Sequence, residues 1–296
     1  SGVAGVISGA GAMGHLYCET RLRAQGSYAG AWNERLNGLG RKAALDSLSA
    51  RDPEEVFHSL KRLRDQVFAT SRFHLAISGI EPIAANVFAT ELGRMTCQVT
   101  ESPLVFQDTC EGIPVNAANF TTGQALQLTD PGAAHVAAHM LETGWLWDSV
   151  RVAGGAYSVR CRYETGDSIL TILSIRDPEP LRTLDCFRAS PVWLARNAHG
   201  DLLERCVVAK MGHLIRAVRP DDRMMIALQR HLSGETDELR QQELEGVGQV
   251  NARSMKHLVQ ELDADFQVAK TVVLGPEDGL ACALAERPGF IILQSE

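Results

Sequence analysis

Hydrophobic and polar positions change their spacing along the chain, and the spacing predicts its elements. Two runs, 157–164 and 168–175, alternate apolar and polar residues as strands do, and a short link containing Gly166 joins them. Short apolar runs predict further strands at 115–120, 268–274 and 290–293. Helical spacing predicts helices at about 131–150, 179–197, 201–217, 220–232, 235–247, 254–265 and 277–286. Because strands and helices come in blocks, we expect an α+β fold, a mixed sheet with helices packed on one face.

The first hundred residues are organised differently. Asp52 and Pro53 make a good N-cap and first helical position, so a helix is predicted over 53–68. Its apolar face comprises Val56, Leu60, Leu63 and Val67. A strand is predicted at 73–78 and a helix at 81–92, whereas the following stretch to residue 112 shows no clear period. This stretch marks the join between two units.

A glycine pattern near the N-terminus opens a remote alternative. Gly9, Gly11 and Gly14 form a GxGxxG motif after an apolar run, as in a turn that binds a dinucleotide pyrophosphate at a helix N-terminus. The second strand and its acidic residue would have to be 28–32 and Glu34. No βαβ alternation follows them. A dinucleotide-binding oxidoreductase built on Gly9–Gly14 is therefore a weak hypothesis.

Composition narrows the classes of function. The chain has 296 residues, 45% of them hydrophobic, and a formal net charge of −7, typical of a globular protein. It contains no Lys/Arg-rich run and no apolar run of transmembrane length, so we expect neither nucleic-acid binding nor a membrane span. The 7 cysteines are scattered without a CxxC pair. This favours reduced thiols in a soluble protein of a reducing compartment such as the cytoplasm.

Two histidines have a spacing that can bind metal. His135 and His139 lie four residues apart on a predicted helix, which can bring two imidazoles to one ion. The zinc-protease pattern needs Glu beside the first His, and position 136 is Val. The inverted pattern H-x-x-E-H is also missing from the sequence. We therefore expect two helical histidines near an interface, and no metal site.

An Arg and a Tyr around a glycine pair are the best candidates for chemistry. Arg151 stands at a helix end and Tyr157 opens a strand, with Gly154 and Gly155 between them. The guanidinium and the phenol are both hydrogen-bond donors, and two converging donors can stabilise the oxyanion that forms from a peptide carbonyl. Spacing alone favours a structural role, an Arg that caps the helix and a Tyr that covers the sheet edge. Strand parity groups Tyr157 with buried positions, so the glycine turn must rotate it outward.

The long stretch that contains these residues resembles a known family. Residues 144–185, GWLWDSVRVAGGAYSVRCRYETGDSILTILSIRDPEPLRTLD, closely resemble the last domain of the pitrilysin/insulinase metallopeptidases, in the branch of presequence proteases and falcilysin. Three further stretches agree in order: 112–122, the helix running into Leu146-Trp147, and 230–240. The resemblance covers about 105–296 well. Residues 1–104 look like the C-terminal part of the preceding, third domain.

The resemblance implies a fold and assigns different parts of the active site to different domains. Family members are expected to have four related α+β domains in two halves that close around a peptide, with zinc on an inverted motif in the first domain. The last domain supplies an Arg and a Tyr to the substrate carbonyl, which correspond to Arg151 and Tyr157, while Gly154 and Gly155 match the family's turn. This chain lacks the zinc motif and the first half.

Two readings of the chain follow from the resemblance. The first is a zinc-free C-terminal portion of a peptide-degrading zinc metallopeptidase, inactive alone and partnered by the zinc-bearing N-terminal half of the same protein. The missing initiator Met favours this reading. The alternative is a naturally separate, non-catalytic peptide-binding subunit that pairs with a catalytic partner.

Overall fold

The structure is a computed structural model that describes residues 14–70, 110–285 and 290–292. Contacts group the chain into two compact units. The larger one comprises 1–46, 104–214 and 243–296, and the smaller one comprises 47–103 and 215–242. The strand predicted at 73–78 and the helix predicted at 81–92 lie outside the described residues.

The larger unit is built on a six-stranded sheet with the order β3-β4-β2-β5-β1-β6. The strands are β1 (Cys110–Pro114), β2 (Phe120–Gln127), β3 (Ser158–Glu164), β4 (Ile169–Asp177), β5 (Lys270–Gly275) and β6 (Phe290–Ile292). β1 runs parallel to β5 and β6, whereas β2 is antiparallel to both β4 and β5, and β3 is antiparallel to β4. The predicted α+β fold with a mixed sheet is confirmed. β3, which follows Tyr157, lies at one edge.

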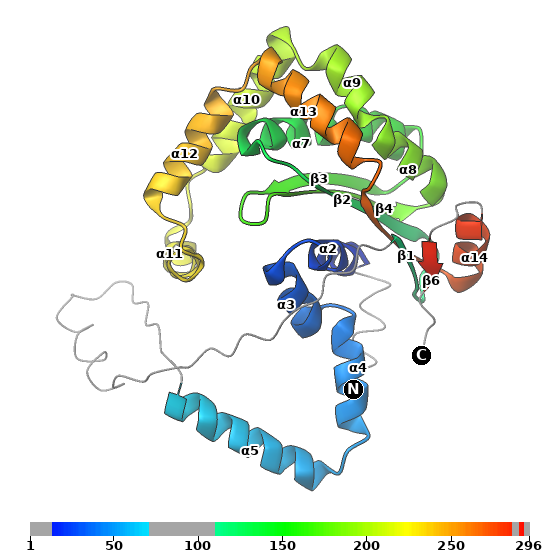
Figure 1. Ribbon diagram of the computed structural model, residues 1–296, viewed down its shortest axis with the longest axis vertical. Coiled ribbons are helices and arrows are strands. Elements are labelled where there is room, and N and C mark those ends of the chain that lie inside the picture. Colours follow the sequence, from blue (N-terminus) through cyan, green and yellow to red (C-terminus); the bar gives the residue numbers. More distant parts are fainter. Residues whose placement is uncertain (1–13, 71–109, 286–289, 293–296) are drawn as a thin grey trace, which may run out of the picture. The chain divides into compact units, whose positions relative to one another are not determined.

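One face of this sheet is covered by a layer of helices (Figure 1). They are α7 (Pro131–Thr143), α8 (Pro180–Arg188), α9 (Ser190–Asn197), α10 (Gly200–Leu214) and α13 (Ala252–Asp265). α7 begins where the Asp130 side chain accepts a hydrogen bond from Ala133 N at 3.0 Å, as expected of an N-cap. Its buried residues pack with alternate residues of β3 and β4, among them Val159 and Ile172, in the main core.

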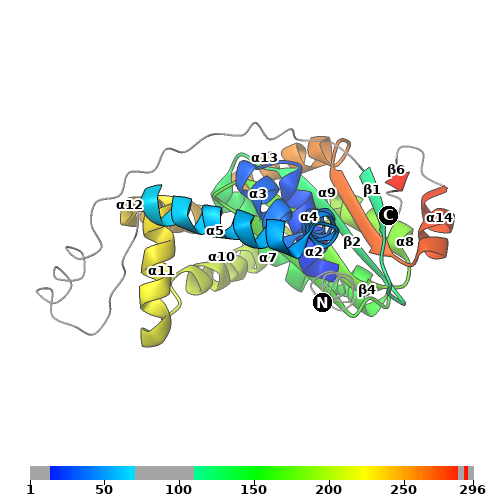
Figure 2. The same ribbon diagram turned by 90° about the horizontal axis from the view of Figure 1, so that it is seen from below.

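The opposite face carries α2 (Gly14–Ala24), as Figures 1 and 2 show. Leu22 of α2 packs with Leu173 of β4 in a second buried cluster. Gly123 of β2 allows this close approach, because a Cβ there would lie 2.7 Å from Leu22 Cδ1. A partly buried ion pair between Arg21 and Glu111, at 2.7 Å, also ties α2 to β1. Hydrophobic burial on both faces explains why the central strands carry few solvated residues.

The remaining elements of the larger unit complete the sheet's surroundings. α3 (Tyr28–Asn37) follows α2, and α14 (Glu277–Ala285) follows β5. α12 (Asp237–Gly248) spans the boundary between the units at residue 243, and α4 (Gly40–Ser49) spans the boundary at residue 47. No helix in the described ranges is long and apolar enough to cross a membrane.

The dinucleotide hypothesis fails at its second strand. Residues 28–37 form the helix α3, so the βαβ unit that the glycine motif needs is not made. Glu34, the proposed acidic residue, is buried and accepts a hydrogen bond from Gly40 N at 3.1 Å. Burial raises the pKa of its carboxyl above the ordinary value. Gly14 opens α2, and the rest of the motif lies outside the described residues.

Three predicted boundaries were wrong. Residues 115–119 form a loop between β1 and β2 rather than a strand at 115–120, because the real strand β2 carries buried Thr and Gln residues that hide its pattern. The helix predicted at 131–150 ends at Thr143, and a separate π-helical turn, η1, follows at Trp147–Val152. The helix predicted at 179–197 is two helices that meet at Ala189, where Pro191 lacks the N–H to continue the first.

The smaller unit contains α5 (Pro53–Thr70) and α11 (Pro220–Ser233). The helix predicted at 53–68 is confirmed, and Asp52 Oδ1 accepts a hydrogen bond from Glu54 N at 3.1 Å at its start. The apolar face predicted for α5 is largely exposed, with Leu60 at 60% and Leu63 at 56%.

Candidate functional site

The backbone between α7 and β3 is shaped by a wide turn and two glycines. In η1, Ala153 N donates to Asp148 O at 2.9 Å, a π-helical hydrogen bond. Such turns occur frequently at functional sites. Gly155 has φ +79°, a conformation that glycine adopts without steric cost. A Cβ on Gly154 would lie 2.4 Å from Val150 O. The Gly-Gly pair is therefore required by the path of the chain.

Arg151, in the last turn of η1, is held by two contacts. Its Nε donates to the backbone oxygen of Tyr157 at 3.1 Å. Its guanidinium carbon lies 3.9 Å from the centroid of the Trp147 ring, within the range of a cation–π interaction. Arg151 is exposed, and its terminal amino groups make no hydrogen bond within the described part of the chain. The planar guanidinium is thus oriented while it keeps N–H donors for a ligand.

Tyr157 is exposed despite strand parity. Its side chain is 65% exposed, whereas Ala156 just before it and Val159 two residues after it are buried. β3 begins at Ser158, so Tyr157 precedes the first paired residue and follows the turn at Gly155. Its backbone N donates to Ile175 O at 3.0 Å, which fixes the main chain. The outward rotation that the sequence required is therefore present.

The side chain of Arg151 contacts the main chain of Tyr157, so the two candidate residues lie together. The guanidinium of Arg151 contacts the carbonyl of Tyr157, and among the described residues no hydrogen bond joins it to the phenol oxygen. Two donors from one short segment therefore lie on the exposed surface beside the edge strand β3. Both side chains carry N–H or O–H donors that are open to a ligand at this surface.

A third residue of this region, Arg176, was missed by the sequence. Its guanidinium carbon lies 5.1 Å from the centroid of the Tyr157 ring. The backbone of Arg176 has φ +51°, unusual for a residue other than glycine. The next residue, Asp177, is fully buried and accepts hydrogen bonds from Ser174 Oγ at 2.6 Å and Glu179 N at 3.0 Å. The Arg-Asp-Pro sequence signalled a turn but gave no sign of the contact with Tyr157.

The two histidines on α7 do not share a site. His135 is buried, and its Nε2 lies 2.7 Å from Glu243 Oε1 and 3.0 Å from Thr165 Oγ1. The hydrogen bond from His135 lowers the pKa of Glu243. His139 instead contacts the ring of His213, with centroids 5.8 Å apart. Within the described ranges no three His, Cys, Asp or Glu side chains could hold a metal ion, so these residues do not fit zinc.

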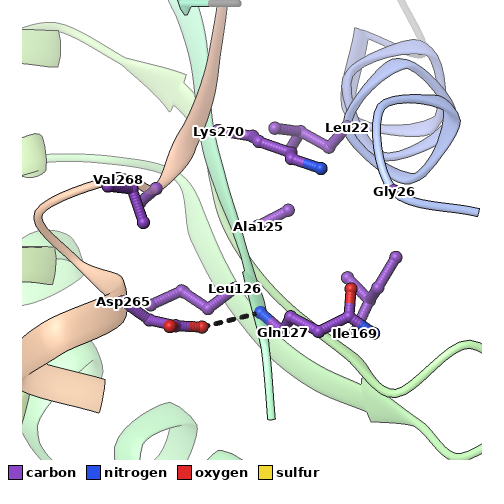
Figure 3. Close-up of a pocket in the computed structure, with 10 residues that line it drawn as sticks. Leu22, Gly26, Ala125, Leu126, Gln127, Ile169, Asp265, Val268 and Lys270 are labelled. Atoms are coloured by element: carbon purple, nitrogen blue, oxygen red, sulfur yellow. Dashed lines mark hydrogen bonds between the residues drawn. The ribbon is translucent and has the colours of Figure 1, made fainter. Parts of the chain in front are cut away.

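A small recess lies elsewhere on the larger unit (Figure 3). It has a volume of about 130 Å³, below the several hundred Å³ usual for ligand pockets. Lys270 Nζ donates to Gln25 O beside it, and Asp265 Oδ2 accepts from Gln127 N at 3.0 Å across its wall. None of the candidate site residues lines this recess.

Comparisons with known proteins agree with the resemblance. A sequence model of the PreP C-terminal domain family matches residues 104–274. "Presequence protease 1, chloroplastic/mitochondrial" of Arabidopsis thaliana is 26% identical, over 94% of this chain and 27% of that protein. "Presequence protease, mitochondrial" of Schizosaccharomyces pombe is 22% identical, over 93% of this chain and 29% of that protein. The chain thus spans under a third of the length of either relative.

The fold also matches a solved structure. A crystal structure of pitrilysin superposes with a TM-score of 0.50 at 12% sequence identity, and the match covers 72% of this chain and 25% of that chain. At this identity the match shows the fold alone.

Proposed function

Because this chain belongs to the family of PreP C-terminal domains, we propose that it is the C-terminal, zinc-free portion of a zinc metallopeptidase that degrades peptides. In this role it helps to enclose the peptide and donates hydrogen bonds to the scissile carbonyl from Arg151 and Tyr157. Gly154 and Gly155 shape the turn beside the bound peptide. Residues 1–104 are then the C-terminal part of the third domain and 105–296 the last domain.

One observation supports the catalytic role most directly. Arg151 is oriented by its bonds to Tyr157 O and to the Trp147 ring, and Tyr157 is exposed beside it. Donors that are fixed before the reaction need little reorganisation when a carbonyl becomes a tetrahedral oxyanion, so they stabilise the transition state more than the substrate. Removing one such donor typically costs about 3–4 kcal/mol of the barrier.

The zinc is proposed to lie in the N-terminal half of the same protein. The described residues of this chain offer no metal-binding group, as the separate partners of His135 and His139 illustrate. That half, or a separate catalytic subunit, is the partner that this chain requires. The partner would activate the attacking water, whereas this chain would hold the substrate carbonyl.

A reducing compartment is part of the same proposal. The cysteines of the described residues are all free thiols, and Cys18 and Cys161 are buried. Burial raises the pKa of both thiols, which keeps them protonated and unreactive.

Replacement of Tyr157 tests the proposal. In the complete enzyme we expect Tyr157→Phe to lower kcat by more than tenfold, on the order of the loss of one donor, with KM changed little because peptide contacts elsewhere remain. The measurement is steady-state cleavage of an unfolded peptide. Tyr28→Phe is the control, since Tyr28 is 61% exposed, close to the exposure of Tyr157. Turnover by Tyr157→Phe near that of the wild type removes the catalytic role.

A further inference from the structure

Arg176 is an extra residue in the sheet. On β4, Ile175 pairs with Thr121 of β2 and Asp177 pairs with Phe120, so the register skips Arg176. The ladder between β3 and β4 ends at Ser158 and Ile175, one residue before it. This geometry is a β-bulge whose extra residue has φ +51°. Glycine usually occupies such a left-handed position, and here an arginine does.

The buried carboxylate of Asp177, the residue after Arg176, stabilises the bulge. Asp177 accepts hydrogen bonds from Ser174 Oγ and from Glu179 N, and it is fully buried. On the neighbouring strand, the backbone N of Tyr157 donates to Ile175 O. The surrounding structure therefore fixes Arg176 in a conformation that an isolated chain rarely adopts.

The side chain of Arg176 lies over the ring of Tyr157. Its guanidinium carbon is 5.1 Å from the ring centroid, and the side chain makes no ion pair within the described part of the chain. Arg151, by contrast, contacts only the backbone oxygen of Tyr157 in a hydrogen bond. Arg176 is thus the charged group that contacts the phenol ring, and a planar cation against an aromatic face restricts the ring's orientation.

We propose that Arg176 is a positioning residue for Tyr157: it stacks on the ring and holds the phenol where it can donate to the scissile carbonyl. This inference rests on the proposed function of Tyr157. Arg176 acts through the ring and not on the substrate itself. This positioning role explains why an arginine occupies the left-handed position: the bulge directs its side chain toward the Tyr157 ring.

The test is Arg176→Gly in the complete enzyme. Glycine removes the contact with the ring and also relieves the left-handed backbone, so we expect Tm to stay level or rise while kcat falls by roughly two- to fivefold, the range that an exposed cation–π contact supports. KM should change by less than twofold. Arg176→Lys keeps the charge without the planar guanidinium and should recover part of kcat. Ser168→Gly is the matched control, because Ser168 has φ +57° in the turn between β3 and β4, and its kcat should equal that of the wild type.

A second variant separates positioning from a general structural role. If Arg176 acts through the phenol, Arg176→Gly should lower kcat no further in a Tyr157→Phe background. An equal loss in both backgrounds, or a marked fall in Tm, assigns Arg176 a structural role and overturns the inference. Full kcat in Arg176→Gly with an impaired Tyr157→Phe overturns the inference alone. Full kcat in Tyr157→Phe overturns the proposed function and the inference together.

Discussion

At the scale of single residues, accessibility separates the candidate site from the core. Tyr157 and Val159 have the same strand parity, yet one is 65% exposed and the other 4%. The difference arises because Tyr157 precedes the paired strand and follows the left-handed turn at Gly155. The sequence predicted that the glycine pair had to rotate this side chain. It could not predict the ring's partner, since the contact of Arg176 depends on a β-bulge between β4 and β2 that the sequence pattern does not show.

His139 provides a residue-scale prediction of pH dependence. Burial, followed by the nearby His213 and Lys210, lowers the pKa of His139, although Glu142 opposes the shift. The unfolded chain therefore binds this proton more readily, so stability is full above pH about 6.5 and falls as the pH drops below it. We expect His139→Gln to flatten this loss below pH about 6.5, measured by thermal unfolding of the chain.

The control for this measurement is His257→Gln, which removes an exposed imidazole from α13. The same flattening in both variants, or an unchanged slope in His139→Gln, contradicts the assignment to His139.

At the scale of elements, buried polar residues decide which strands the hydrophobic pattern could predict. β3 was predicted because its more exposed residues alternate with buried ones, whereas β4, although buried along most of its length, carries a strand-like run rich in Ile and Leu. β2 was missed because it is covered on both faces and carries polar residues inside. Gln124, for example, is buried and donates to Thr271 Oγ1 of β5 at 3.0 Å. A buried amide that donates to the next strand leaves no trace in the hydrophobic pattern.

The contact between α2 and the sheet gives an element-scale prediction. A Cβ on Gly123 would lie 2.6 Å from Leu173 Cδ2 and 2.8 Å from Cys18 Sγ, so the helix or the strand must shift. We expect Gly123→Ala to lower the free energy of unfolding by about 1–3 kcal/mol, the usual cost of overpacking. Urea unfolding of the chain measures it. Gly166→Ala is the control, since nothing lies within 4 Å of a Cβ in that turn. Equal stability of the two variants contradicts close packing of α2 on β2.

At the scale of the whole molecule, the chain corresponds to only part of the length of its relatives. It spans 27% and 29% of two presequence proteases, and its described residues offer no metal group. Periodicity predicted the α+β class, and the stretch around Arg151 and Tyr157 predicted the family. Neither could show that the guanidinium is fixed by the Tyr157 carbonyl and the Trp147 ring, because that depends on the π-helical turn η1.

The central claim is that this chain supplies two donors to a carbonyl while the rest of the protein supplies the zinc. The most direct measurement is the single-turnover cleavage rate of the complete enzyme that carries Arg151→Gln together with Tyr157→Phe. The account predicts that zinc content and peptide affinity stay close to those of the wild type while the rate falls by at least about a hundredfold, the loss expected for oxyanion donors. A double variant that cleaves within threefold of the wild-type rate contradicts the account.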